Sequence, residues 1–79
     1  MKIAERIKYL REEKGMSQAE LGRAMNVARM TINNYEVDKR SPDIAFTLKL
    51  ADYFDVTIDY LIGKSEFKKQ NDKDIHLSK

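Results

Sequence analysis

Four side chains in the middle of the chain, Arg29, Met30, Asn33 and Asn34, share the outer face of a predicted helix. Arginine can pair with the two acceptors of guanine in the major groove, and asparagine can pair with adenine. Met30 could contact a thymine methyl group or could cover the edge of the core. Ala28 begins this helix, and its small side chain could lie close to a base or a sugar. These five residues predict a base-reading surface, with an idle polar surface as the alternative.

Two short helices joined by a tight turn must position this face, and the run from Ser17 to Glu36 predicts both. Ser17 and Glu20 form an S-x-x-E capping box at the start of the first helix. Asn26 ends that helix, because asparagine accepts the left-handed conformation that a tight turn requires. Apolar residues at helical spacing predict the inner faces of the two helices: Leu21, Ala24 and Met25, then Ala28, Ile32 and Tyr35.

This stretch resembles the helix-turn-helix of the Cro/CI-type (XRE-type, lambda-repressor-like) DNA-binding family. The residues that match the family pattern are Gln18, Gly22, Asn26, Val27, Ile32, Tyr35, Glu36 and Pro42. The resemblance extends over roughly residues 3–63. It implies an all-α, compact five-helix lambda-repressor-like domain. It further implies a sequence-specific transcriptional regulator, most simply a repressor, that binds double-stranded DNA as a homodimer on a pseudo-palindromic operator.

The resemblance also implies roles for individual residues. Arg11 is expected to form a structural ion pair with Glu36, and Gly22 is expected to let the two helices cross closely. The phosphate-contacting candidates are Ser17, Gln18, Thr31, Lys39 and Arg40. The chain departs from the family pattern at Ala28, where serine or threonine is usual, and at Asp38 and Asp55, where glycine is usual.

The chain predicts a fourth helix over about residues 44–54, and the spacing of its apolar residues indicates a core face and a second apolar face. The residues of the predicted core face are Ile44, Thr47, Leu48, Ala51 and Phe54. Phe46 and Tyr53 fall nearly opposite them, which indicates either a dimer surface or cover by other helices. Tyr60 and Ile62 lie near the end where the family commonly dimerises, so we add both to the dimer candidates.

The remaining elements follow from apolar spacing and turn residues. Ile3, Ile7 and Leu10 predict a first helix, which Gly15 ends, and Thr57 caps a last helix over residues 58–62. We therefore expect a DNA-binding domain at residues 1–63 and a flexible or partner-binding tail at residues 64–79. Ile75 and Leu77 could form a short strand or contact a partner, and His76 has no companion metal ligands.

Composition limits the classes of function. The chain has 79 residues, 15 Lys and Arg against 13 Asp and Glu, one histidine and no cysteine. No stretch approaches a membrane span and no signal peptide precedes the domain, so we expect a soluble, cytoplasmic protein. Because no nucleophile–base motif or phosphate loop is present, we expect no enzyme, no metal and no cofactor. Two alternatives stay open: an antitoxin with the same DNA-binding motif, and a protein-interaction or anti-repressor module with little affinity for DNA.

Overall fold

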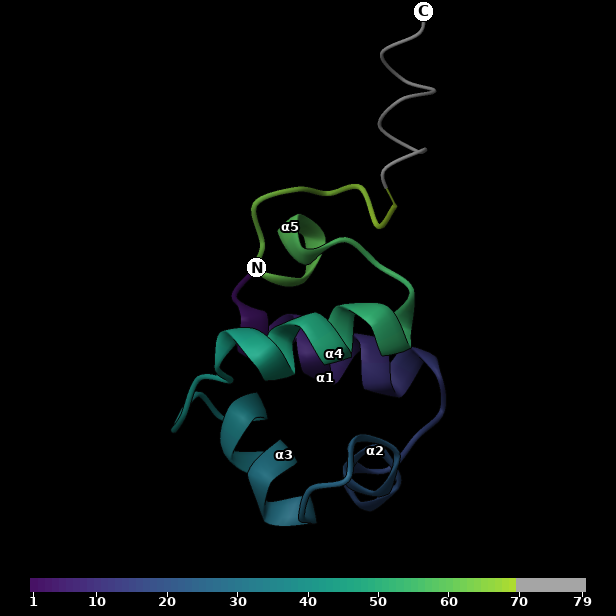
Figure 1. Ribbon diagram of the computed structural model, residues 1–79, viewed down its shortest axis with the longest axis vertical. Coiled ribbons are helices and arrows are strands. Elements are labelled where there is room, and N and C mark those ends of the chain that lie inside the picture. Colours follow the sequence, from purple (N-terminus) through teal and green to yellow (C-terminus); the bar gives the residue numbers. More distant parts are fainter. Residues whose placement is uncertain (70–79) are drawn as a thin grey trace, which may run out of the picture.

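The computed structural model describes residues 1–69, and within that range it consists of five helices without a strand. The helices are α1 (Ile3–Glu13), α2 (Gln18–Met25), α3 (Arg29–Glu36), α4 (Ile44–Phe54) and α5 (Ile58–Leu61). Figure 1 shows α1 and α4 across the middle of the molecule, α2 and α3 at one end, and α5 at the other end beside the N-terminus. The all-α, five-helix prediction is therefore confirmed. The expectations for Ile75, His76 and Leu77 lie outside the described residues.

Local side-chain chemistry sets the helix ends as predicted. The Ser17 hydroxyl accepts the main-chain N–H of Glu20 at 3.0 Å, and the Glu20 carboxylate accepts that of Ser17 at 2.7 Å. The side chains of Asp43 and Thr57 likewise accept main-chain N–H groups at the starts of α4 and α5, without a returning bond from the third residue of the helix. Three residues adopt the left-handed conformation after helices: Asn26 after α2, Asp38 in the turn after α3, and Asp55 after α4. Such short polar residues tolerate positive φ better than other non-glycine residues.

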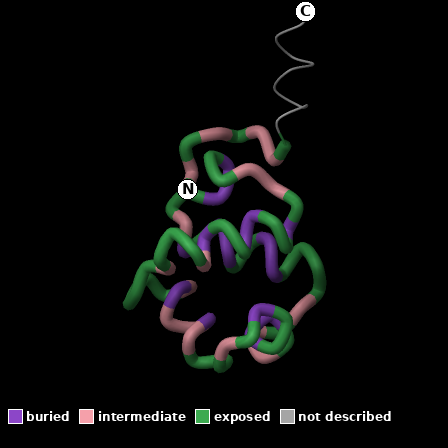
Figure 2. Tube along the Cα trace, viewed as in Figure 1, coloured by how far each residue is buried: buried purple, intermediate pink, exposed green. Residues whose placement is uncertain are grey.

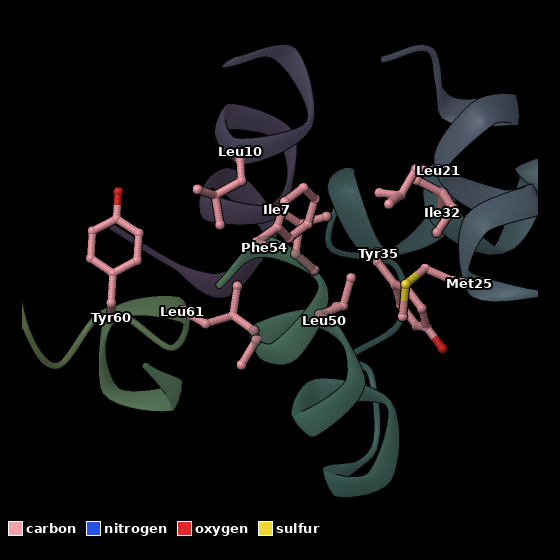
Figure 3. Close-up of a cluster of buried hydrophobic side chains, with 11 residues drawn as sticks. Ile7, Leu10, Leu21, Met25, Ile32, Tyr35, Leu50, Phe54, Tyr60 and Leu61 are labelled. Atoms are coloured by element: carbon pink, nitrogen blue, oxygen red, sulfur yellow. The ribbon is translucent and has the colours of Figure 1, made fainter. Parts of the chain in front are cut away.

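One apolar cluster joins all five helices (Figure 3). Figure 2 marks the buried positions along the chain. Its members are Ile7, Leu10, Leu21, Met25, Ile32, Tyr35, Leu50, Ala51, Phe54, Tyr60 and Leu61. Burial of each large aliphatic side chain contributes about 1.5–3 kcal/mol. Because both helices of the predicted DNA-binding motif contribute to this cluster, the motif is fixed to the rest of the domain.

The predicted inner face of α4 is wrong in part. Ile44 is 79% exposed and Leu48 is 49% exposed, whereas Leu50 is fully buried. Phe46, expected to face outward, is half-buried and packs its ring 5.3 Å from that of Tyr35. The helix is apolar around most of its circumference, so the spacing of its residues does not define a single face.

Tyr60 was predicted to lie on a dimer surface, and this expectation is corrected. Tyr60 is only 4% exposed, because the guanidinium of Arg6 lies 3.8 Å above its ring centroid. Arg6 is itself buried, and its Nε has no hydrogen-bond partner among the described residues. A buried arginine on α1 therefore packs on the tyrosine ring of α5 through a cation–π contact, which the sequence analysis did not predict.

Residues 64–69, placed in the predicted tail, lie against the helices. The main-chain N–H of Thr57 donates to the carbonyl of Lys68 at 2.7 Å, and the Lys68 ammonium donates to Glu13 at 3.0 Å. That ammonium lowers the pKa of the Glu13 carboxyl. Lys69 pairs with Asp55 at 2.9 Å. The boundary after Gly63 stays a prediction.

In the part of the chain described, none of the helices has the length and apolar character needed to cross a membrane.

Candidate nucleic-acid interface

The turn between α2 and α3 depends on close approach at Gly22. The main-chain N–H of Val27 donates to the Gly22 carbonyl at 2.8 Å. A Cβ atom built on Gly22 would lie 2.8 Å from the carbonyl oxygen of Val27, closer than real Cβ contacts. The close crossing that the resemblance implied is present, and in this structure it leaves no room for a Cβ atom at residue 22 where α3 begins beside the middle of α2.

α3 buries one side and leaves its predicted base-reading side accessible. Ile32 and Tyr35 are buried, whereas Arg29 and Met30 are exposed and Asn33 and Asn34 are half-buried. With 52% of Met30 exposed, this side chain is available at the surface instead of covering the core. The predicted base-reading residues thus occupy the accessible side of α3.

Ala28 stands apart from the inner series in which it was placed. It is exposed at the N-cap of α3 and makes no side-chain capping bond. An alanine N-cap forgoes about 1 kcal/mol that serine or threonine would contribute. The apolar face of α3 therefore starts at Ile32.

The expected ion pair between Arg11 and Glu36 is present, and it joins α1 to the end of α3. Arg11 donates from Nε to Glu36 Oε2 at 2.6 Å and from Nη2 to Glu36 Oε1 at 3.0 Å. A third bond runs from its Nη1 to the carbonyl of Met16 at 2.7 Å. The bonds to Glu36 raise the pKa of the guanidinium. This two-pronged geometry, with 2% of the Glu36 side chain exposed, fastens the end of α3 to α1.

Gln18 links this ion pair to the base-reading side of α3. Its Nε2 donates to Glu36 Oε1 at 3.1 Å and to Asn33 Oδ1 at 3.2 Å. Its Oε1 accepts a long bond of 3.4 Å from Nη1 of Arg29. Both amide protons are used within the protein, so the Gln18 side chain has no donor left for a phosphate. That network depends on contacts between helices and was not part of the sequence-based prediction.

The other phosphate candidates surround α3. Ser17 is exposed at the start of α2, and Thr31 is half-buried in the first turn of α3. Lys39 and Arg40 are exposed beyond the other end of α3, where both main-chain N–H groups donate to the carbonyl of Asn34. The charge of Asp38, which could oppose a phosphate beside them, is directed toward Lys2 at 3.4 Å.

A family model described as "Helix-turn-helix" matches residues 7–61, which include α2, the turn and α3. The chain belongs to this helix-turn-helix family. Among its relatives is the HTH-type transcriptional regulator ImmR of Bacillus subtilis (strain 168), 37% identical over 75 residues. The match covers 95% of this chain and 59% of ImmR. The HTH-type transcriptional regulator AnsR of the same organism is 31% identical over 74 residues, 94% of this chain and 64% of AnsR. The chain thus spans less than two thirds of either helix-turn-helix relative.

Two solved structures share the fold of this helix-turn-helix protein. The P22 c2 repressor protein, crystallised in complex with the synthetic operator 9T, matches with a TM-score of 0.75 and 26% identity, over 82% of this chain and 98% of that one. A transcriptional regulator from Listeria innocua matches with a TM-score of 0.75 and 29% identity, over 98% of this chain and 74% of that one. The predicted lambda-repressor-like fold is therefore confirmed.

Proposed function

We propose that this helix-turn-helix protein is a sequence-specific, DNA-binding transcriptional regulator that acts as a repressor in the cytoplasm. The observation that carries the proposal is α3, whose Arg29 and Met30 are exposed while Ile32 and Tyr35 anchor the opposite side. An α-helix presented in this way fits the major groove of a duplex. The shared fold with the P22 c2 repressor, solved on a synthetic operator, supports the same reading. The role requires no catalysis, cofactor or metal.

The base contacts in this proposal come from the accessible side of α3. Arg29 pairs with guanine, and Asn33 and Asn34 read base edges deeper in the groove. Met30 and Ala28 supply apolar contacts, with Met30 suited to a thymine methyl group. These residues carry sequence preference because they reach base edges, whereas contacts to phosphates carry none directly.

The phosphate contacts in this proposal come from both ends of α3 and from the start of α2. Ser17 and Thr31 offer hydroxyl groups, and Lys39 and Arg40 offer charge. Because the side-chain amide of Gln18 is already used, we assign its phosphate contact to the main-chain N–H at the start of α2, where helix N-termini favour anions. Affinity should then fall by about 0.9 in log K per neutralised phosphate for each unit rise in log salt.

A second copy of the chain is the partner that we propose for an exposed apolar surface on α4 and α5. This surface, the α4–α5 patch, consists of Ile44, Leu48, Ile58 and Ile62, which line one shallow groove with Pro42. Of the predicted dimer residues the patch keeps Ile62 and leaves out Phe46, which packs on Tyr35. Tyr53 is 36% exposed outside the patch and stays a dimer candidate. To bind a pseudo-palindromic operator, such a two-fold dimer has to present its two α3 helices about 34 Å apart, one turn of DNA.

Selection from random duplexes tests the proposed function. The wild-type protein should enrich a sequence with two-fold symmetry at moderate salt. Arg29→Ala should then cost about 1–3 kcal/mol of binding and relax preference at one base pair per half-site. Equal loss on every sequence would remove the base-reading role of Arg29. A protein that enriches no sequence would refute the proposal and favour the protein-interaction module.

Sedimentation of a variant in the α4–α5 patch tests the dimer. Leu48→Glu introduces a charge into the patch and should lower the self-association of the protein. The matched control is Lys49→Glu, because Lys49 is exposed on the same helix but does not line the groove. Equal association of the two variants would exclude the patch as the dimer contact.

A further inference from the structure

We propose that the buried charge of Glu36 fixes the direction in which the amide of Asn33 faces the DNA, with Gln18 as the relay between them. Glu36 and Gln18 would then be positioning residues that determine base preference without contact to a base. The inference rests on the proposed DNA-binding function, and it says how the orientation of one base-reading side chain is determined.

The first step is the polarity of Gln18. Both oxygens of Glu36 accept bonds from Arg11, at 2.6 and 3.0 Å, so Glu36 is a carboxylate that can only accept. The end of the Gln18 amide that lies 3.1 Å from Glu36 must therefore be the NH₂ group. With 2% of the Glu36 side chain exposed, water has little access to compete for this bond.

The second step passes this polarity to α3. The NH₂ group of Gln18 can only donate, so the Asn33 atom 3.2 Å away must be the carbonyl oxygen Oδ1. The NH₂ group of Asn33 is thereby directed away from Gln18. The Gln18 oxygen, at the other end of the same amide, accepts from Arg29 at 3.4 Å. One carboxylate thus sets the orientation of two neighbouring amides.

The consequence for a duplex is a preference for acceptors opposite Asn33. Guanine offers N7 and O6 in the major groove, thymine offers O4 and adenine offers N7, whereas cytosine offers only the N4 donor. An asparagine held with its NH₂ group outward should therefore discriminate against cytosine. Once freed from Gln18, the amide can rotate by half a turn, present its oxygen and accept from cytosine.

Gln18→Met tests the relay on DNA, because methionine has a similar length and no amide. The base pair read by Asn33 is first identified as the one at which Asn33→Ala loses preference. At that pair the wild-type protein should disfavour cytosine by about 5-fold, the effect of one hydrogen bond, and Gln18→Met should remove this bias. In the Asn33→Ala background, Gln18→Met should leave the preference at that pair unchanged. Circular dichroism checks that each variant is folded.

A second measurement tests the relay in the free protein. Glu36→Gln makes the relay ambiguous, since a neutral amide can donate or accept. It should shift the side-chain NH₂ resonances of both Gln18 and Asn33 in a ¹H–¹⁵N spectrum. Glu12→Gln is the matched control, because its carboxylate lies 4.0 Å from the same Arg11 but does not contact Gln18.

The two measurements separate the possible failures. A uniform loss of affinity in Gln18→Met with unchanged preference for bases would overturn the relay and leave the proposed function standing. Asn33 resonances that respond equally to Glu36→Gln and Glu12→Gln would overturn it as well, without any DNA. Failure of the wild-type protein to enrich any duplex would refute the proposed function, and the base preference inferred for Asn33 would fall with it.

Discussion

Arg11→Met removes three hydrogen bonds that join α1 to the end of α3 and to the loop before α2. Two of these bonds end on Glu36 and the third ends on the carbonyl of Met16, all at 3.0 Å or less. Among the described residues, the Glu36 carboxylate, with 2% of its side chain exposed, would keep the bond from Gln18 alone. The variant therefore leaves a buried charge without its counter-ion.

The expected loss of stability follows from this burial. Removing one member of a buried ion pair costs about 3–5 kcal/mol, and the remaining bond from Gln18 favours the lower end, about 3 kcal/mol. At about 4–8 °C per kcal/mol for a domain of this size, the melting temperature should fall by about 12–24 °C. Replacing Glu36 as well, in Arg11→Met/Glu36→Leu, should restore most of the loss, because apolar residues of similar volume often substitute for a buried pair at little cost.

Urea unfolding followed by circular dichroism measures these free energies. Arg40→Met is the matched control, since Arg40 is exposed, and it should stay within about 0.5 kcal/mol of the wild-type protein. A loss below about 1 kcal/mol for Arg11→Met would show that the pair behaves like one on the surface. A double variant whose loss equals the sum of the two single losses would show that the two charges are not coupled.

Three further predictions concern stability. Gly22→Ala should lower the free energy of unfolding by about 1–3 kcal/mol in thermal unfolding, because the overlap of the new Cβ with the Val27 carbonyl outweighs the better helix propensity of alanine. An increase in stability would contradict the close crossing. Asp55→Gly should stabilise it by about 0.5–1 kcal/mol, since glycine adopts φ near 56° without strain, whereas Asp52→Gly inside α4 should destabilise it. The N-cap N–H bond lowers the pKa of Glu20 in the folded state, so its contribution is complete above the ordinary value of 4.5 and is lost as pH falls through the lowered pKa. The free energy of unfolding of Glu20→Gln should therefore vary less with pH in this acid range than that of the wild-type protein. If the pH dependence is unchanged, other carboxylates cause it.

The features that the sequence predicted well are those decided by near neighbours. Ser17 and Glu20 are three residues apart, and the left-handed turn at Asn26 depends on the residue itself. The pair of Arg11 and Glu36 joins distant parts of the chain, and only the family resemblance suggested it. Local chemistry therefore predicted the helix boundaries, while the resemblance supplied the long-range contact.

The features that the sequence could not predict depend on distances between helices. In α4, so many positions are apolar that either Leu48 or Leu50 could have faced the core, and only the packing of the other helices decides for Leu50. From its residue type Arg6 would be expected at the surface, and only the arrangement of α1 and α5 brings its guanidinium above the tyrosine ring of α5. The sequence suggested a phosphate role for Gln18, but it could not show that Glu36 and Asn33 both accept hydrogen bonds from its amide.

The two buried side chains of α3, Ile32 and Tyr35, have a consequence for protein engineering. A library that varies Arg29, Met30 and Asn34 leaves both anchors untouched, so retargeted variants should fold as readily as the parent. Asn33 is different, because its carbonyl is bonded to α2. A new residue there calls for a compensating change at the neighbouring glutamine, and successful redesigns should therefore alter both positions together.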